Sequence, residues 1–131
     1  MLDLIRDDFN SYLEFVFEKI RREFLWEQDL PFTFVRIGRW WHKDKEIDIV
    51  ALNEETKEIA FFEVKWSDLG MVDAKRVLGK LEAKSGFVDW NKGTRVEYFG
   101  LIAKRLVGKE SLAEEGYLCY DLEDMQDVWG L

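Results

Sequence analysis

The chain has 131 residues, 47% hydrophobic and 15% aromatic, which is enough apolar material to fill one core. Its one cysteine and one histidine exclude an internal disulfide and a Cys/His zinc cage within one chain, so any metal must be held by oxygen. The net charge of −8 argues against a broad basic surface for nucleic acid, although seven acids lie after residue 109 and the rest of the chain is close to neutral.

We expect one domain over residues 1–131, because no repeat, low-complexity stretch or Pro/Gly/Ser-rich linker divides the sequence. No apolar run approaches the roughly eighteen residues of a membrane span. The N-terminus also carries acids where a signal peptide would carry basic charge. These features predict a soluble, cytoplasmic protein with no membrane partner.

The first predicted element is an amphipathic helix over residues 8–25. Its apolar side chains recur at intervals of three and four residues: Phe9, Leu13, Val16, Phe17, Ile20 and Phe24. Residues 32–36 then have the aromatic and β-branched content of a short strand that stops at Gly38. The polar segment 39–45, which contains two tryptophans, is typical of a loop or wide turn.

Two clear strands follow, over residues 46–52 and 57–66, and their short connection favours an antiparallel hairpin. Helical period returns over residues 68–85 and ends beside Gly86, a natural helix stop. Two more strands and a short terminal helix are predicted over residues 96–103, 117–120 and 121–127. This order predicts an α/β fold with an αβββαβ core, in which helices flank a mixed central sheet.

Charged residues interrupt both strands of the predicted hairpin. Period two puts Glu63 and Lys65 on the face of Phe61, at the end of a strand that otherwise looks buried. Asp48 interrupts the apolar first strand in the same way. A register in which Val50 opposes Phe61 puts Asp48 directly opposite Glu63. Two like charges so placed destabilise a sheet unless a cation lies between them.

Carboxylate oxygens, together with a nearby main-chain carbonyl and water, suit Mg²⁺ or Mn²⁺ better than zinc. The sequence therefore predicts a divalent-metal site at Asp48, Glu63 and Val64, the last through its main chain. Lys65 would lie beside the metal, where it could orient an attacking water or offset charge developing on a phosphate. The alternative is an ordinary cluster of ion pairs at a sheet edge.

Residues 46–51, EIDIVA, and 62–66, FEVKW, resemble the D…ExK core of the PD-(D/E)XK nuclease superfamily, whose fold is that of restriction endonucleases. The resemblance implies that Asp48 and Glu63 are metal-binding carboxylates and that Lys65 is the catalytic lysine. It therefore implies a metal-dependent, endonuclease-like hydrolase that acts on DNA.

Two positions add to this resemblance or depart from it. Glu18 matches an acid that many superfamily members carry on the first helix as a further catalytic ligand or water-orienting group. Helical spacing alone would instead pair it on the surface with Arg21 or Arg22. Ile47 stands where the proline of the superfamily's name would precede the aspartate.

More narrowly, residues 8–13, 16–18 and 38–41, together with the hairpin, resemble the C-terminal nuclease-like domain attached to a group of archaeal P-loop ATPases. The chain itself contains no P-loop motif. We therefore expect the partner to be DNA, a P-loop ATPase domain or subunit, or a second copy of the chain in a homodimer. The resemblance also implies that the chain could be a piece of a longer ATPase.

Basic and aromatic residues near the hairpin are candidate contacts for DNA. Arg39 and Lys43 could pair with phosphates and Trp41 could stack on a base, although tryptophans in a small domain mostly pack. Basic residues also line the second predicted helix: Lys75, Arg76, Lys80 and Lys84. They form either a solvated helix surface or a set of phosphate contacts. Against the nuclease hypothesis stands a non-catalytic module that binds nucleic acid, an ATPase or a sister subunit.

Overall fold

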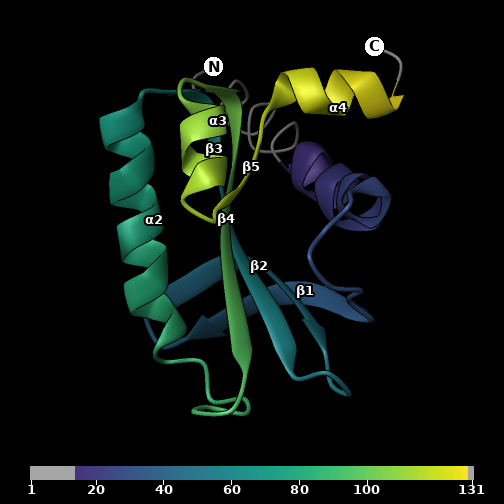
Figure 1. The fold of residues 1–131 in the computed structure, drawn as a ribbon, viewed down its shortest axis with the longest axis vertical. Helices are drawn as coiled ribbons and strands as arrows, with labels where there is room; N and C mark the ends of the chain where they lie inside the picture. Colours follow the sequence, from purple (N-terminus) through teal and green to yellow (C-terminus); the bar gives the residue numbers. More distant parts are fainter. Residues whose placement is uncertain (1–13, 130–131) are drawn as a thin grey trace, which may run out of the picture.

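A computed structural model describes residues 14–129, and one five-stranded sheet in the order β1-β2-β3-β4-β5 forms its centre (Figure 1). The strands are β1 (Arg36–His42), β2 (Lys45–Asn53), β3 (Glu58–Leu69), β4 (Val96–Leu106) and β5 (Leu118–Tyr120). The first three strands pair in antiparallel fashion, whereas β3, β4 and β5 run parallel. The sheet is therefore mixed, as the sequence predicts.

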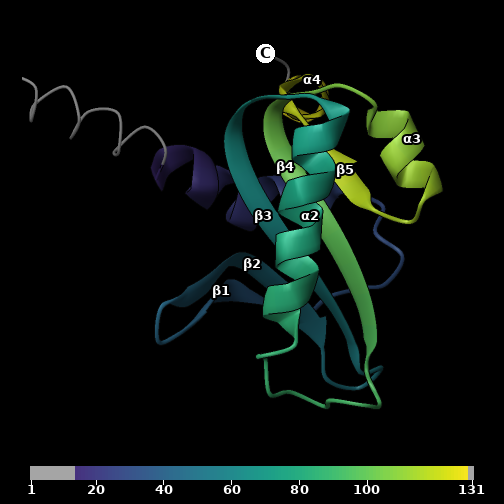
Figure 2. The same cartoon turned by 90° about the vertical axis from the view of Figure 1, so that its left-hand side faces the viewer.

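Helices cover both faces of this sheet. Within the described chain, an N-terminal helical segment covers residues 14–19 and continues through η1 (Ile20–Phe24) and η2 (Leu25–Glu27). The other helices are α2 (Met71–Ser85), α3 (Lys109–Glu114) and α4 (Leu122–Trp129). Figure 2 shows α2 crossing in front of β3 and β4, with the hairpin of β1 and β2 extending away from it. No helix of the described part is long and apolar enough to cross a membrane.

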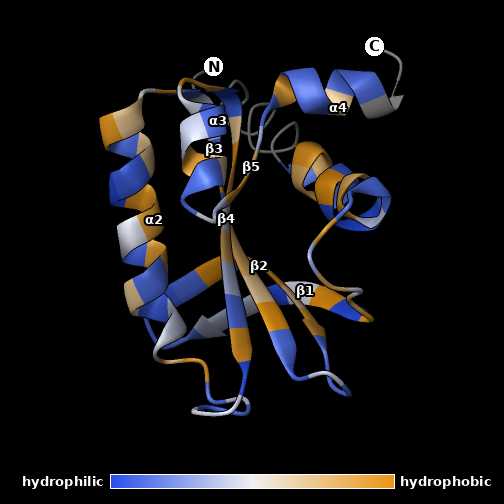
Figure 3. Ribbon diagram, in the orientation of Figure 1, coloured by the Kyte–Doolittle hydropathy of each residue, from blue (hydrophilic) through white to orange (hydrophobic). Residues whose placement is uncertain are grey.

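Two hydrophobic cores lie on the two faces of the sheet. The N-terminal helical segment and α4 pack on the face that carries Ile49 and Phe62. The helices α2 and α3 pack on the other face, which carries Phe61 and Leu101. Both faces of β3 are thus buried, as its sequence predicts. Hydrophobic and hydrophilic residues both occur on α2 in Figure 3, because one side of this helix meets the sheet and another meets solvent.

The C-terminal end of α2 is held by one buried arginine. The guanidinium of Arg95 donates hydrogen bonds to the main-chain carbonyls of Ser85, Val88 and Trp90, at 2.9, 2.7 and 2.8 Å. It also pairs with Glu97 at 2.8 Å. These bonds tie the end of α2 and the loop that follows it to the start of β4.

The structure corrects the prediction for the segment before β2. The first strand covers residues 36–42 and not 32–36, and most of the segment predicted as a loop lies in β1. Only Lys43 and Asp44 form the turn, where Lys43 has a left-handed φ of 57°. Hydrogen bonds to β2 hold this polar, tryptophan-rich stretch in a strand. Its own sequence does not predict that pairing. The short helix α3 was also absent from the prediction.

Candidate functional site

Two carboxylates, Asp48 of β2 and Glu63 of β3, form the centre of the candidate site, and we call them the acidic pair. Val50 opposes Phe61 as predicted, and the ladder continues to Ile49 opposite Phe62. The next position brings the two acids together, close enough for the Asp48 carboxylate to raise the pKa of Glu63. Asp48 Oδ2 also accepts a hydrogen bond of 2.9 Å from the main-chain N–H of Val64.

An irregularity in β2 lies at the same place. Gly38 pairs with Val50, but Trp40 pairs with Ile47, so three steps along β2 match two along β1. The extra residue turns the strand, and Ile47 and Ile49 consequently pack in the cores on opposite faces. Such bulges re-aim side chains, and they are frequent beside active sites.

Glu63 is a buried acid whose ionisation is strongly perturbed. Its side chain is among the few buried charged groups of the described chain, with 5% of the residue exposed. Burial and the neighbouring Asp48 carboxylate raise the pKa of Glu63 from 4.5 to about 7, although the Lys84 ammonium acts in the opposite direction. The protonation of Glu63 therefore changes near neutral pH, as is common for groups in functional sites.

Lys84, near the end of α2, contacts the acidic pair directly. Its ammonium forms an ion pair with Glu63 and donates a hydrogen bond of 2.8 Å to the main-chain carbonyl of Glu46. Sequence reasoning placed Lys84 on a basic helix surface and did not connect it to the acids. No spacing in the sequence could reveal the contact, because it depends on how α2 docks on the sheet.

Lys65 lies in the same pocket as Glu63. This pocket has a volume of about 180 Å³, and its lining is Glu63, Lys65, Arg76, Val77, Lys80 and Lys84. Lys65 is exposed, and it has no ion-pair partner among residues 14–129. Glu63 thus lies beside Asp48 and shares a pocket with Lys65.

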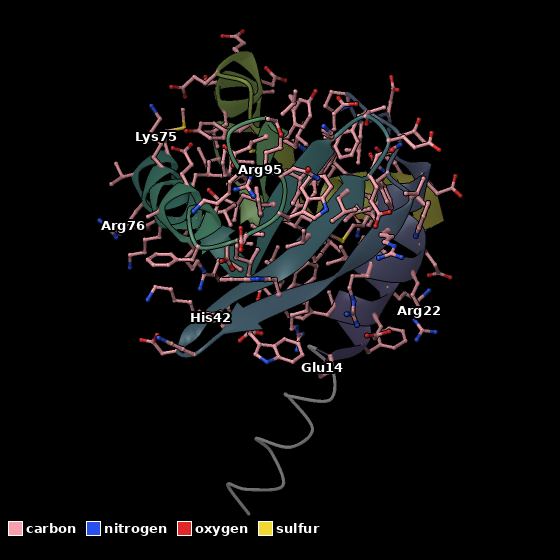
Figure 4. All side chains as sticks on the ribbon, turned by 90° about the horizontal axis from the view of Figure 1, so that it is seen from below. Glu14, Arg22, His42, Lys75, Arg76 and Arg95 are labelled. Atoms are coloured by element: carbon pink, nitrogen blue, oxygen red, sulfur yellow. The ribbon has the colours of Figure 1, made fainter. Side chains whose placement is uncertain are left out.

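Glu18 is held elsewhere. It forms ion pairs with Arg21 and with Arg22, the latter at 2.8 Å. Its helical segment packs on the face of the sheet opposite α2, and Figure 4 shows Arg22 and Arg76 on opposite sides of the sheet. The structure thus shows the surface pairing that helical spacing favours, and a catalytic role for Glu18 stays a prediction.

The basic and aromatic candidates for DNA contact lie on β1 and in the turn that follows it. Arg39, Trp41 and Lys43 line a shallow hollow of about 350 Å³. Arg39 also pairs with Glu46 at 3.4 Å and with Glu14 at 3.8 Å. Trp41 is 69% exposed, whereas the neighbouring Trp40 packs against the α2 core. One tryptophan of the pair is therefore structural, and the other is available for contact.

The acidic pair could offer two carboxylates to a hard divalent cation. No group of three or more His, Cys, Asp or Glu side chains converges within residues 14–129. Mg²⁺, however, is commonly bound by one or two carboxylates and retains several waters. A cation here would take the position of the Lys84 ammonium at Glu63. The main-chain N–H of Val64 donates a hydrogen bond to Asp48. A role for the main-chain carbonyl of Val64 as a metal ligand stays a prediction.

The raised pKa of Glu63 predicts a pH-dependent stability. Between about pH 4.5 and 7 the folded chain holds a proton on Glu63 that the unfolded chain has released, so this residue's contribution to stability falls as pH rises. We expect the difference in unfolding free energy between the wild type and Glu63→Gln to fall by up to about 3 kcal/mol over that range. Urea unfolding at several pH values measures it, and a difference independent of pH would contradict the assignment.

Comparison with known proteins identifies the family. A family model described as "Archaea bacterial proteins of unknown function" (DUF234) matches residues 1–77, more than half of the chain, and the chain belongs to this family. An uncharacterized protein of Methanocaldococcus jannaschii is 42% identical over 130 residues. The match covers 94% of this chain and 28% of that protein, so the chain spans little more than a quarter of its relative. No solved structure matches the chain.

Proposed function

We propose that the chain is a nuclease-like domain of the PD-(D/E)XK superfamily that hydrolyses phosphodiester bonds of DNA with Mg²⁺ or Mn²⁺. The observation that carries the proposal is the acidic pair itself, two neighbouring carboxylates on adjacent strands, with Lys65 in the pocket that Glu63 lines. The mixed sheet flanked by helices, in the order expected of that superfamily, supports it.

The residues of the site divide the chemistry between them. A bound divalent ion would lower the pKa of water and neutralise charge on a phosphate. Asp48 and Glu63 would hold this ion, and the N–H of Val64 keeps the Asp48 carboxylate in position. Lys65 is exposed in the pocket beside Glu63, where its ammonium can orient water or stabilise charge developing on the phosphate.

A cleavage assay tests this proposal. We expect Mn²⁺-dependent cleavage of single-stranded, duplex or branched DNA by the wild type. Lys65→Ala should lower the rate by about a hundredfold, because it removes one preorganised positive charge from the site. The matched control is Lys57→Ala, which removes an exposed lysine from the turn between β2 and β3. Cleavage that persists unchanged in Lys65→Ala would assign the activity to another site or to a contaminant.

The second candidate is a non-catalytic module that binds nucleic acid, an ATPase or a sister subunit. The ion pair between Lys84 and Glu63 favours it, because the chain's own ammonium already neutralises one member of the acidic pair. The greater length of the archaeal relative is also consistent with a module attached to a larger protein. Absence of both cleavage and any effect of metal on the melting temperature would support this function over the first.

A further inference from the structure

The pocket beside Glu63 continues along α2 as a line of positive charge. Arg76, Lys80 and Lys84 recur at every fourth residue, so their side chains follow one side of the helix with about 6 Å of rise between neighbours. Lys65 projects into the same space from β3. We call the space between these four residues the α2 groove.

Among residues 14–129, the charges that line the α2 groove are not balanced. Four cations of this part of the chain face the groove, and Glu63 is the one acid in its lining. Lys84 pairs with Glu63, and Arg76 pairs with Asp73 at 3.0 Å. Lys65 and Lys80 have no ion-pair partner within the described residues. Like charges held together repel one another, so an anion that enters the groove is stabilised there.

The rest of α2 shows that this imbalance is local. Lys75 precedes Arg76 on the same helix, but it lies outside the groove and pairs with Glu115 at 3.4 Å. Figure 4 shows Lys75 and Arg76 projecting from α2 in different directions. The chain as a whole is strongly acidic, with a net charge of −8, so unpaired lysines that share one hollow are not a general feature of its surface.

We infer that the α2 groove binds the sugar-phosphate backbone of a single polynucleotide strand and leads it along α2 to the acidic pair. The inference deepens the proposed function and rests on it for the identity of the polyanion. Successive cations one helical turn apart can each meet a phosphate of one strand. Lys84 lies at the inner end, where it contacts both the groove and Glu63.

The size and surroundings of the groove favour one strand over a duplex. A hollow of about 180 Å³ has room for part of one strand, and not for the width of two strands. A duplex needs a broad basic surface, and the chain's net negative charge opposes one.

Binding without cleavage tests the inference. Fluorescence anisotropy of a labelled oligothymidine, measured in EDTA over a series of salt concentrations, compares the wild type with Lys80→Ala and Lys75→Ala. We expect Lys80→Ala to weaken binding about fivefold and to reduce the salt slope by about 0.7, the value for one phosphate contact on a single strand. Lys75→Ala, from the same helix but outside the groove, should bind as the wild type does.

Three results would overturn the inference: no binding by the wild type, equal losses in the two variants, or a duplex of the same length that binds as tightly as the single strand. Melting temperatures of both variants establish that they are folded. Binding that depends on Lys80, without any cleavage in Mn²⁺, would retain the groove and remove the nuclease proposal. Cleavage in Mn²⁺, together with binding that does not depend on Lys80, would retain the nuclease proposal and remove the groove.

Discussion

Replacing Asp48 with asparagine is expected to abolish the response of the protein to divalent metal. The wild type should gain about 2.7 kcal/mol of stability at a metal concentration a hundredfold above the Kd, seen as a rise in melting temperature. Asparagine keeps an oxygen that can accept the 2.9 Å hydrogen bond from Val64, but it removes the charge that attracts a cation. Metal should therefore not raise the melting temperature of Asp48→Asn, and cleavage should fall by at least about a hundredfold.

Lys84→Met is the informative comparison, because this substitution should strengthen metal binding, whereas Asp48→Asn should abolish it. Removing the ammonium that pairs with Glu63 leaves the acidic pair without an internal cation, so metal should bind more tightly, by about tenfold. Calorimetric titration with Mn²⁺ measures both variants. A metal response that survives in Asp48→Asn would place the binding site elsewhere on the chain.

Gly100→Ala should produce the largest loss of stability. Gly100 of β4 pairs with Phe62 on one side and Leu118 on the other. An added Cβ would lie 2.4 Å from Phe62 Cδ1 and 2.5 Å from the main-chain oxygen of Leu118, closer than real contacts allow. The core on that face is closely packed, so the clash should destabilise the fold by about 3 kcal/mol and lower the melting temperature by roughly 10 °C.

Gly79→Ala supplies the matched control for this substitution. Gly79 lies within α2, and nothing is within 4 Å of the position of its added Cβ. Alanine should therefore stabilise the helix by about 1 kcal/mol. Thermal unfolding of the two variants beside the wild type checks both signs. A Gly100→Ala protein as stable as the wild type would contradict the close packing of Phe62 against β4.

The local parts of the site were readable from periodicity. Alternation along β3 puts Phe61 and Glu63 on one face, and the short turn between β2 and β3 leaves few registers for the hairpin. The predicted opposition of Val50 and Phe61 is confirmed. Apart from the unpredicted helix α3, the order of elements and the mixed sheet also followed from the pattern, because each strand or helix carries its own period. The strand β1 was misplaced, since its polar sequence contains no clear alternation.

Other features of the site depend on contacts between residues far apart in the chain. Lys84 reaches Glu63 because α2 packs across β3, and the raised pKa of Glu63 results from burial that this packing creates. The α2 groove exists for the same reason. The sequence by itself thus determined which residues share a strand face, because that depends on backbone geometry between near neighbours. Only the tertiary structure decided which helix lysines meet the acids, because docking depends on the shapes of both cores together.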